Sequence, residues 1–319
     1  MHEERKFQDV PVNGIVLRTV VEGDGPLVIL LHGWPQGWNF WRNQIDPLVA
    51  AGYRVAVPDM RGYGGSSKPE EVDEYNILKL TSDIPALAKA LGHDTFQLVG
   101  HDWGCIVAWN TALLNEDTCT AVMGLSVPFW YPDETIIDPP GADDKFWFMR
   151  YLQDPEVADT FMDANAREFL QKVYYCLSND APNLSFMKQF EYGRDANIID
   201  FLPKTSELPK CISEEEFEYN LAQFIEGGFR GPNNYYRNLL QHRALAPQLD
   251  GKKFSQPAAF LYGENDDVPE FQPGWEEGFR NAFEDLRFIE VVPNAAHWVQ
   301  LEQPEETTKH ILRFLRETS

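Results

Sequence analysis

The sequence GHDWG at residues 100–104 constrains the fold more than any other segment, because a strand has to turn sharply into a helix there. Glycines on both sides of Asp102 permit a tight turn that lifts one side chain above a sheet. The alternative is that Asp102 only caps the following helix, as Asp often does. The two flanking glycines favour the strained turn. We therefore predict a strand–turn–helix unit with Asp102 at its tip.

Strand-like and helix-like segments alternate around this turn. The predicted strands cover residues 14–21, 27–31, 54–58, 95–99 and 121–127, and the predicted helices cover 38–51, 77–91 and 104–114. A continuous apolar run such as 27–31 is typical of a strand buried on both faces. The expected fold class is therefore α/β, a mostly parallel sheet with helices on both faces.

The alternation stops in the middle of the chain and then returns. Residues 129–247 are rich in aromatic side chains, helical in pattern and broken by Pro and Gly. After Pro257, strands are predicted at 258–263 and 287–292, and helices at 272–283 and 305–315. The sequence thus predicts a core of residues 1–128 and 248–319, interrupted by an inserted helical cap (lid) of residues 129–247.

The chain is strongly acidic, with 50 Asp and Glu against 27 Lys and Arg and a formal charge of −23. Such a surface repels phosphates and anionic lipid headgroups, so we expect no nucleic-acid and no membrane partner. The first ten residues, MHEERKFQDV, contain no apolar signal core, and no apolar run approaches the ~20 residues of a membrane span. We expect a cytoplasmic protein.

The four cysteines, Cys105, Cys119, Cys176 and Cys211, are widely spaced and form no CxxC pair. This pattern fits neither a zinc site nor a disulfide framework, so we expect buried free thiols. We expect neither a metal nor another cofactor.

A carboxylate at the tip of the turn indicates a particular chemistry. Aspartate is ionised above about pH 4, so Asp102 needs no base for a first attack. A carboxylate attacks amides poorly, but it can displace a leaving group or open a strained ring at an sp³ carbon. The product is an alkyl ester of the enzyme, whose hydrolysis does require a base.

Two later residues complete a candidate triad. His297 follows the last predicted strand and is the candidate base. Hydrolases built on such a turn carry nucleophile, acid and histidine in this chain order. Asp266 follows the predicted strand 258–263 and is the expected acid, with Asp267 and Glu264 as competitors. A loop His or a turn Asp alone is usually an ordinary residue, but all three in this order favour a catalytic site.

A second turn supplies a candidate oxyanion hole. The sequence HGWP at residues 32–35 directly follows the predicted strand 27–31. We expect the backbone N–H groups of Trp34 and Trp103 to face the Asp102 carboxylate and to hold the oxyanion that forms when water attacks the ester. His32 itself is interpreted as a structural residue.

Five segments together resemble one family. They are HGWPQ, DMRGYGGSSKP, GHDWG, GFRGPNNYYR and AAHWVQLEQPEE. The chain resembles the soluble epoxide hydrolases of the α/β-hydrolase superfamily over nearly its whole length, and haloalkane and fluoroacetate dehalogenases are close relatives. The resemblance implies a small apolar epoxide as substrate, a possible homodimer, and Tyr236 as a cap residue that donates to the epoxide oxygen. Tyr235 stands one place earlier and is a possible substrate contact.

The chain departs from this family at a second cap position. Relatives carry another tyrosine there, whereas the matching residue here is Phe148. Tyr236 is then the single clear ring-opening acid. Trp147 and Tyr151 are possible substitutes or substrate contacts, although aromatic residues in such a segment are more often packing.

Two other functions remain open from the sequence. Trp103 follows Asp102, as in haloalkane dehalogenases, where an indole N–H stabilises the departing halide; position 34, however, is Trp rather than Asn. Fluoroacetate dehalogenases carry Arg in place of Trp103, which argues against that activity. A non-catalytic ligand receptor on the same scaffold is the third interpretation. Diol release, halide release, or tight apolar binding without turnover would distinguish the three.

Overall fold

The computed structural model describes residues 5–130, 134–181, 186–272 and 274–318 of the chain. Some residues that the sequence analysis used lie outside the described ranges. They are residues 1–4 of the N-terminal stretch, 131–133 and 182–185 of the predicted cap, and residue 273 of the predicted helix 272–283. The strands are β1 (Phe7–Val12), β2 (Ile15–Glu22), β3 (Leu27–Leu31), β4 (Arg54–Pro58), β5 (Phe96–His101), β6 (Cys119–Leu125), β7 (Ala258–Gly263) and β8 (Leu286–Val292). They form one 8-stranded sheet in the order β1-β2-β4-β3-β5-β6-β7-β8.

The sheet is mostly parallel, as predicted. Strands β4, β3, β5, β6, β7 and β8 run parallel to one another, whereas β2 is antiparallel to both β1 and β4. The sequence did not predict β1. Its residues FQDVPV bury only Val10 and Val12, and Pro11 is tolerated because the strand lies at the sheet edge.

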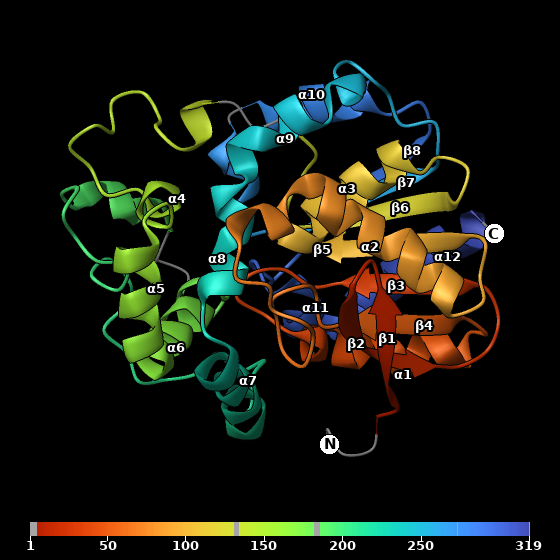
Figure 1. Cartoon of the computed structure of the whole chain (residues 1–319), viewed down its shortest axis with the longest axis horizontal. Coiled ribbons are helices and arrows are strands. Elements are labelled where there is room, and N and C mark those ends of the chain that lie inside the picture. Colours follow the sequence, from red (N-terminus) through yellow and green to blue (C-terminus); the bar gives the residue numbers. More distant parts are fainter. Residues whose placement is uncertain (1–4, 131–133, 182–185, 273, 319) are drawn as a thin grey trace.

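Helices cover both faces of the sheet, because alternate side chains of its buried strands point to opposite sides (Figure 1). Val28 and Leu30 of β3 belong to a core with residues of α1 and α12, whereas Ile29 packs in the core that includes α2 and α3. These helices are α1 (Arg42–Ala50), α2 (Ile77–Ala90), α3 (Trp103–Leu114), α10 (Trp275–Ala282), α11 (Val299–Glu302) and α12 (Pro304–Glu317). The predicted helix 38–51 is in fact a 3₁₀ turn, Trp38–Trp41, followed by α1.

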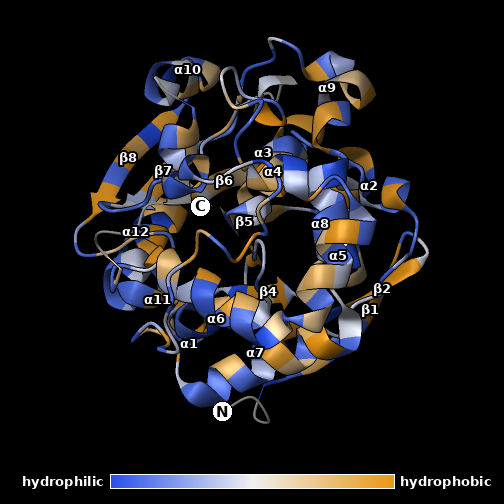
Figure 2. Ribbon diagram, turned by 90° about the vertical axis from the view of Figure 1, so that its left-hand side faces the viewer, coloured by the Kyte–Doolittle hydropathy of each residue, from blue (hydrophilic) through white to orange (hydrophobic). Residues whose placement is uncertain are grey.

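The described residues between β6 and β7 are helical and contribute no strand to the sheet. They form α4 (Phe148–Tyr151), α5 (Pro155–Ala164), α6 (Ala166–Cys176), α7 (Glu214–Gly227), α8 (Arg230–Arg237) and α9 (His242–Leu245), with short 3₁₀ turns. Figures 1 and 2 show α4–α7 lying to one side of the sheet, with α8 running between them and the core helices. The boundaries of a separate cap remain a prediction.

All four cysteines are free, and Cys105, Cys119 and Cys176 are buried. Cys211 is only partly buried, which corrects the expectation for that residue. It lies in the irregular segment before α7, where its carbonyl accepts a hydrogen bond from Arg42.

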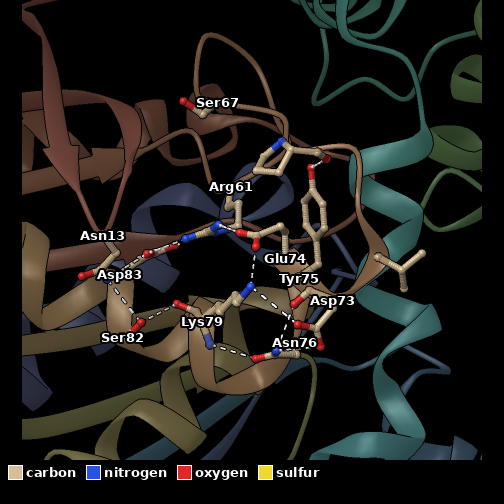
Figure 3. A network of polar contacts seen from close by, with 12 residues as sticks. Asn13, Arg61, Ser67, Asp73, Glu74, Tyr75, Asn76, Lys79, Ser82 and Asp83 are labelled. Carbon is tan, nitrogen blue, oxygen red and sulfur yellow. Dashed lines mark hydrogen bonds and ion pairs between the residues drawn. The ribbon is translucent and has the colours of Figure 1, made fainter.

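A buried ion pair fixes the loop that follows β4 (Figure 3). Arg61 donates from Nε and Nη2 to the two carboxylate oxygens of Asp83 on α2, both at 2.9 Å, and from Nη1 to Glu74 at 3.1 Å. Asn13 also donates to Asp83, at 3.1 Å. Both Arg61 and Asp83 are almost fully buried, so each charge depends on the other for compensation.

Replacing one partner of this pair should be costly. Asp83→Ala leaves the Arg61 guanidinium buried with only Glu74 as an anion, and we expect the free energy of unfolding to fall by about 3 kcal/mol. Urea unfolding measures the change. Glu306→Ala is the control, since it removes an exposed partner of Lys309 and should change stability by less than about 0.5 kcal/mol. Equal, small effects of the two variants would contradict the assignment.

Candidate active site

The predicted turn is present between β5 and α3. Asp102 adopts φ 55° and ψ −122°, a strained left-handed conformation for a residue with a side chain. A Cβ at Gly100 would lie 2.3 Å from the carbonyl oxygen of Gly104, and a Cβ at Gly104 would lie 2.1 Å from that of Leu31. Both glycines are therefore required for α3 to pack closely on β5 and β3.

The Asp102 carboxylate faces backbone donors from two loops. The N–H of Trp34, in the loop after β3, donates to Asp102 Oδ1 at 2.6 Å. The N–H of Trp103 also bonds to this carboxylate. Burial is the largest influence and raises the pKa of Asp102, while nearby His297 and the two N–H groups act in the opposite direction. Gly33 is needed here as well, because its Cβ would lie 2.2 Å from Asp102 Oδ1.

The structure brings His297 and Asp266 to this carboxylate. His297 Nε2 lies 3.7 Å from Asp102 Oδ2, and His297 Nδ1 lies 3.3 Å from each carboxylate oxygen of Asp266. Among the acid candidates, Asp266 is the one that faces the imidazole. Glu264 instead accepts from the N–H of Asn294.

Opposing influences act on the imidazole of His297. Burial, the largest of them, lowers its pKa, but Asp266 and then Asp102 favour the charged form, and the pKa ends above the ordinary value of 6.5. The backbone around the ring is held as well. The His297 carbonyl accepts from His101 Nε2 at 2.7 Å and from Ser126 Oγ at 3.1 Å.

Asp102 and His297 line a cavity with mostly apolar walls. The other lining residues are Trp34, Trp103, Ile106, Val127, Trp130, Phe148, Met149, Leu177, Tyr236, Leu239, Val268 and Phe271. They come from both the sheet-forming part of the chain and the helical segment between β6 and β7. The arrangement places a carboxylate, an imidazole and one phenol in a largely apolar cavity.

Comparisons with known proteins agree with this geometry. Residues 26–304 match the family described as alpha/beta hydrolase fold. The chain is 35% identical to epoxide hydrolase A of Mycobacterium tuberculosis over 315 residues, which cover 96% of each chain. The chain belongs to the epoxide hydrolase family of α/β hydrolases.

Solved structures of epoxide hydrolases share the fold over almost the whole chain. Epoxide hydrolase A of Mycobacterium thermoresistibile superposes with a TM-score of 0.91 at 36% identity and 99% coverage of both chains. Epoxide hydrolase I of potato (Solanum tuberosum) superposes with a TM-score of 0.84 at 30% identity, covering 98% of this chain and 100% of the potato chain.

The aromatic residues proposed for the cap differ in their placement. Tyr236 on α8 lines the cavity, with its ring centroid 5.0 Å from that of Trp103 and 5.7 Å from that of Phe148. Phe148 lines it too, on α4. Burial and the Asp102 charge raise the pKa of Tyr236 well above 10, so its phenol keeps its proton.

Three of the possible substrate contacts do not line the cavity, because their polar atoms are turned to other partners. Trp147 Nε1 donates to the carbonyl of Ile136 at 2.7 Å. The hydroxyl of Tyr151 donates to Asn197 Oδ1 at 3.2 Å. The hydroxyl of Tyr235 donates to the Arg61 carbonyl at 2.8 Å. Successive residues of a helix point about 100° apart, so Tyr235 faces away from the cavity that its neighbour Tyr236 lines.

The sequence missed most of the apolar wall. Met149, Leu177 and Phe271 come from three distant segments, and nothing in their local sequence distinguishes them from packing residues. The described residues contain no group of three or more His, Cys, Asp or Glu side chains able to hold a metal ion. In the same part of the chain, no helix has the length and apolar character needed to cross a bilayer.

The electrostatics of the triad can be tested directly. We expect the imidazole of His297 to titrate above 6.5, because two carboxylates stabilise its protonated form. Asp266→Asn should lower this pKa more than Asp102→Asn, since Asp266 has the larger effect. NMR titration of the histidine ring signals measures both shifts, with His297→Gln to assign the resonance. A pKa that neither substitution lowers would contradict this account.

Proposed function

We propose that this protein hydrolyses epoxides to vicinal diols through a covalent ester on Asp102. The observation that carries the proposal is the pairing of a nucleophile and an acid in one cavity. The carboxylate of Asp102 and the phenol of Tyr236 line the same apolar space. Ring opening needs both, because the carbon is attacked while the oxygen leaves as an alkoxide.

In the first step, an Asp102 oxygen attacks an epoxide carbon and the carbon–oxygen bond of the ring breaks. An alkoxide in this apolar cavity would be a costly unpaired charge. Tyr236 transfers its proton to the leaving oxygen, which yields a hydroxyalkyl ester of Asp102 and a phenolate. No other hydroxyl group is among the described residues that line the cavity.

In the second step, His297 takes a proton from water while the water oxygen attacks the ester carbonyl. The 3.7 Å separation between His297 Nε2 and Asp102 Oδ2 exceeds a direct hydrogen bond and suits a base that acts through water. The N–H groups of Trp34 and Trp103 stabilise the resulting oxyanion. Collapse releases the diol and restores the carboxylate, and the imidazolium proton returns to the Tyr236 phenolate.

Asp266 has a supporting role in this scheme. Its carboxylate faces His297 Nδ1 with both oxygens, so it orients the ring and stabilises the imidazolium. The apolar lining suits a small apolar epoxide, whose substituents are held by shape rather than by hydrogen bonds.

A haloalkane dehalogenase is not supported by the indole contacts. Halide stabilisation needs free N–H donors in the cavity. The side chain of Trp103, the indole next to Asp102, is hydrogen-bonded to Tyr236. Trp34 Nε1 donates to Asn233 Oδ1 at 3.0 Å, and Trp147 Nε1 donates to a backbone carbonyl outside the cavity. Ring opening with Tyr236 as donor requires no such group.

The nucleophile and the base should be separable by mutation. His297→Gln should still form the ester but should release diol at least about 10²-fold more slowly, because the general base is gone. Mass spectrometry of the intact protein should then show the mass of the epoxide added to Asp102. Asp266→Asn should also slow release, while Asp267→Asn should not. A single turnover in ¹⁸O-water that puts full label into the first diol would exclude the ester.

The single phenol should dominate ring opening. Tyr236→Phe should slow ester formation by about 10²-fold or more, the usual worth of a positioned acid. Stopped-flow fluorescence of the cavity tryptophans measures this step. Tyr151→Phe is the matched control and should change it by less than about twofold, since that hydroxyl bonds outside the cavity. A severe effect of Tyr151→Phe with a mild one of Tyr236→Phe would place the donor on the other segment.

A further inference from the structure

The segment that follows α6 touches both loops of the candidate triad. The N–H of His297 donates to the carbonyl of Leu177 at 3.1 Å. Asn265, next to Asp266, donates from its side chain to Asn179 Oδ1 at 2.7 Å. Residues 177–179 of the helical segment between β6 and β7 therefore lie directly against the residues proposed as base and acid.

Glu302 on α11 joins the histidine loop to this same segment. Its Oε2 accepts the N–H of Ala296, the residue before His297, at 2.8 Å. Its Oε1 accepts the N–H of Asn179. One carboxylate thus bonds to two backbone donors from parts of the chain more than a hundred residues apart.

This arrangement requires a carboxylate. A glutamine offers one oxygen, and its NH₂ group would face the second backbone N–H, donor against donor. The negative charge has a cost at this place, because burial raises the pKa of Glu302 to about 7. Asp266 raises that pKa further, whereas His297 lowers it. The histidine loop is therefore held at Ala296 by a buried carboxylate, whose charge is costly to bury, and not by a neutral side chain.

We propose that Glu302 is a positioning residue for His297: its carboxylate holds the peptide before His297 against residues 177–179 and so sets the imidazole for the attack of water on the ester. This inference rests on the proposed epoxide hydrolysis. Glu302 touches no reacting atom. It holds the backbone of the loop through its two hydrogen bonds, and its charge also raises the pKa of the nearby His297.

The two steps of the reaction depend differently on this contact. Attack by Asp102 and donation by Tyr236 do not use the imidazole, whereas hydrolysis of the ester does. A base displaced by a fraction of an ångström to 1 Å loses much of its effect, up to about 10²-fold. A loss of general stability would instead slow both steps together.

The test compares the two rates in Glu302→Gln with those of the unmodified protein. In a single turnover of styrene oxide, we expect ester formation to stay within about twofold and ester hydrolysis to fall by about tenfold or more, so that the ester accumulates. Quenched samples analysed by mass spectrometry give both rates. Glu302→Asp keeps the charge but shortens the reach, and it should show the same split if the Gln variant does not fold.

Gln303→Ala is the matched control. Gln303 is the neighbour of Glu302 and donates to the carbonyl of Asn294 in the same loop, at 3.1 Å, but it does not reach residues 177–179. Both of its rates should match those of the unmodified protein. Unchanged hydrolysis in Glu302→Gln, or an equal fall in both steps, would overturn the positioning role. Absence of any ester in the unmodified protein would overturn the proposed function itself.

Discussion

The carboxylate of Asp102 lies beneath two backbone N–H groups at the tip of a turn that its glycine neighbours permit, and the site is arranged around this contact. The turn is possible because α3 approaches β3 and β5 without intervening side chains. A Cβ at Gly104 would lie 2.1 Å from the carbonyl oxygen of Leu31. The same close approach brings the loop after β3 near enough for the N–H of Trp34 to reach Asp102 Oδ1.

The position of Asp102 also determines the charges that act on His297. Asp102 and Asp266 are two carboxylates around one buried imidazole, and their combined field raises the pKa of His297 against the effect of burial. In the proposed ester, Asp102 is neutral and its contribution to this field disappears. The imidazole would then lose part of its preference for the proton, which suits a group that has to act as a base at that stage.

Much of this site could be predicted from sequence because each catalytic candidate directly follows a predicted strand. GHDWG follows a buried strand, and His297 and Asp266 follow the last two, so a parallel sheet brings them to one edge. The edge strand β1 was missed because its mixed residues resemble a loop. The cavity wall was missed for another reason, since Met149, Leu177 and Phe271 meet only through tertiary packing. The direction in which the side chains of Trp147 and Tyr151 point likewise depends on the backbone conformation around α4.

Tertiary packing also fixes the position of Tyr236, the only phenol among the described residues that line the cavity. Phe148 packs against Tyr236, with ring centroids 5.7 Å apart, and carries no hydroxyl, so no second phenol in the cavity can share an alkoxide charge. The helix that carries Tyr236 is anchored through the neighbouring Tyr235, whose hydroxyl donates to the carbonyl of Arg61. The guanidinium of Arg61 is in turn fixed by its two bonds to Asp83 (Figure 3). The hydrogen bond from Tyr235 and the buried ion pair of Arg61 thus join α8, the helix that carries the proposed donor, to the loop after β4 and to α2.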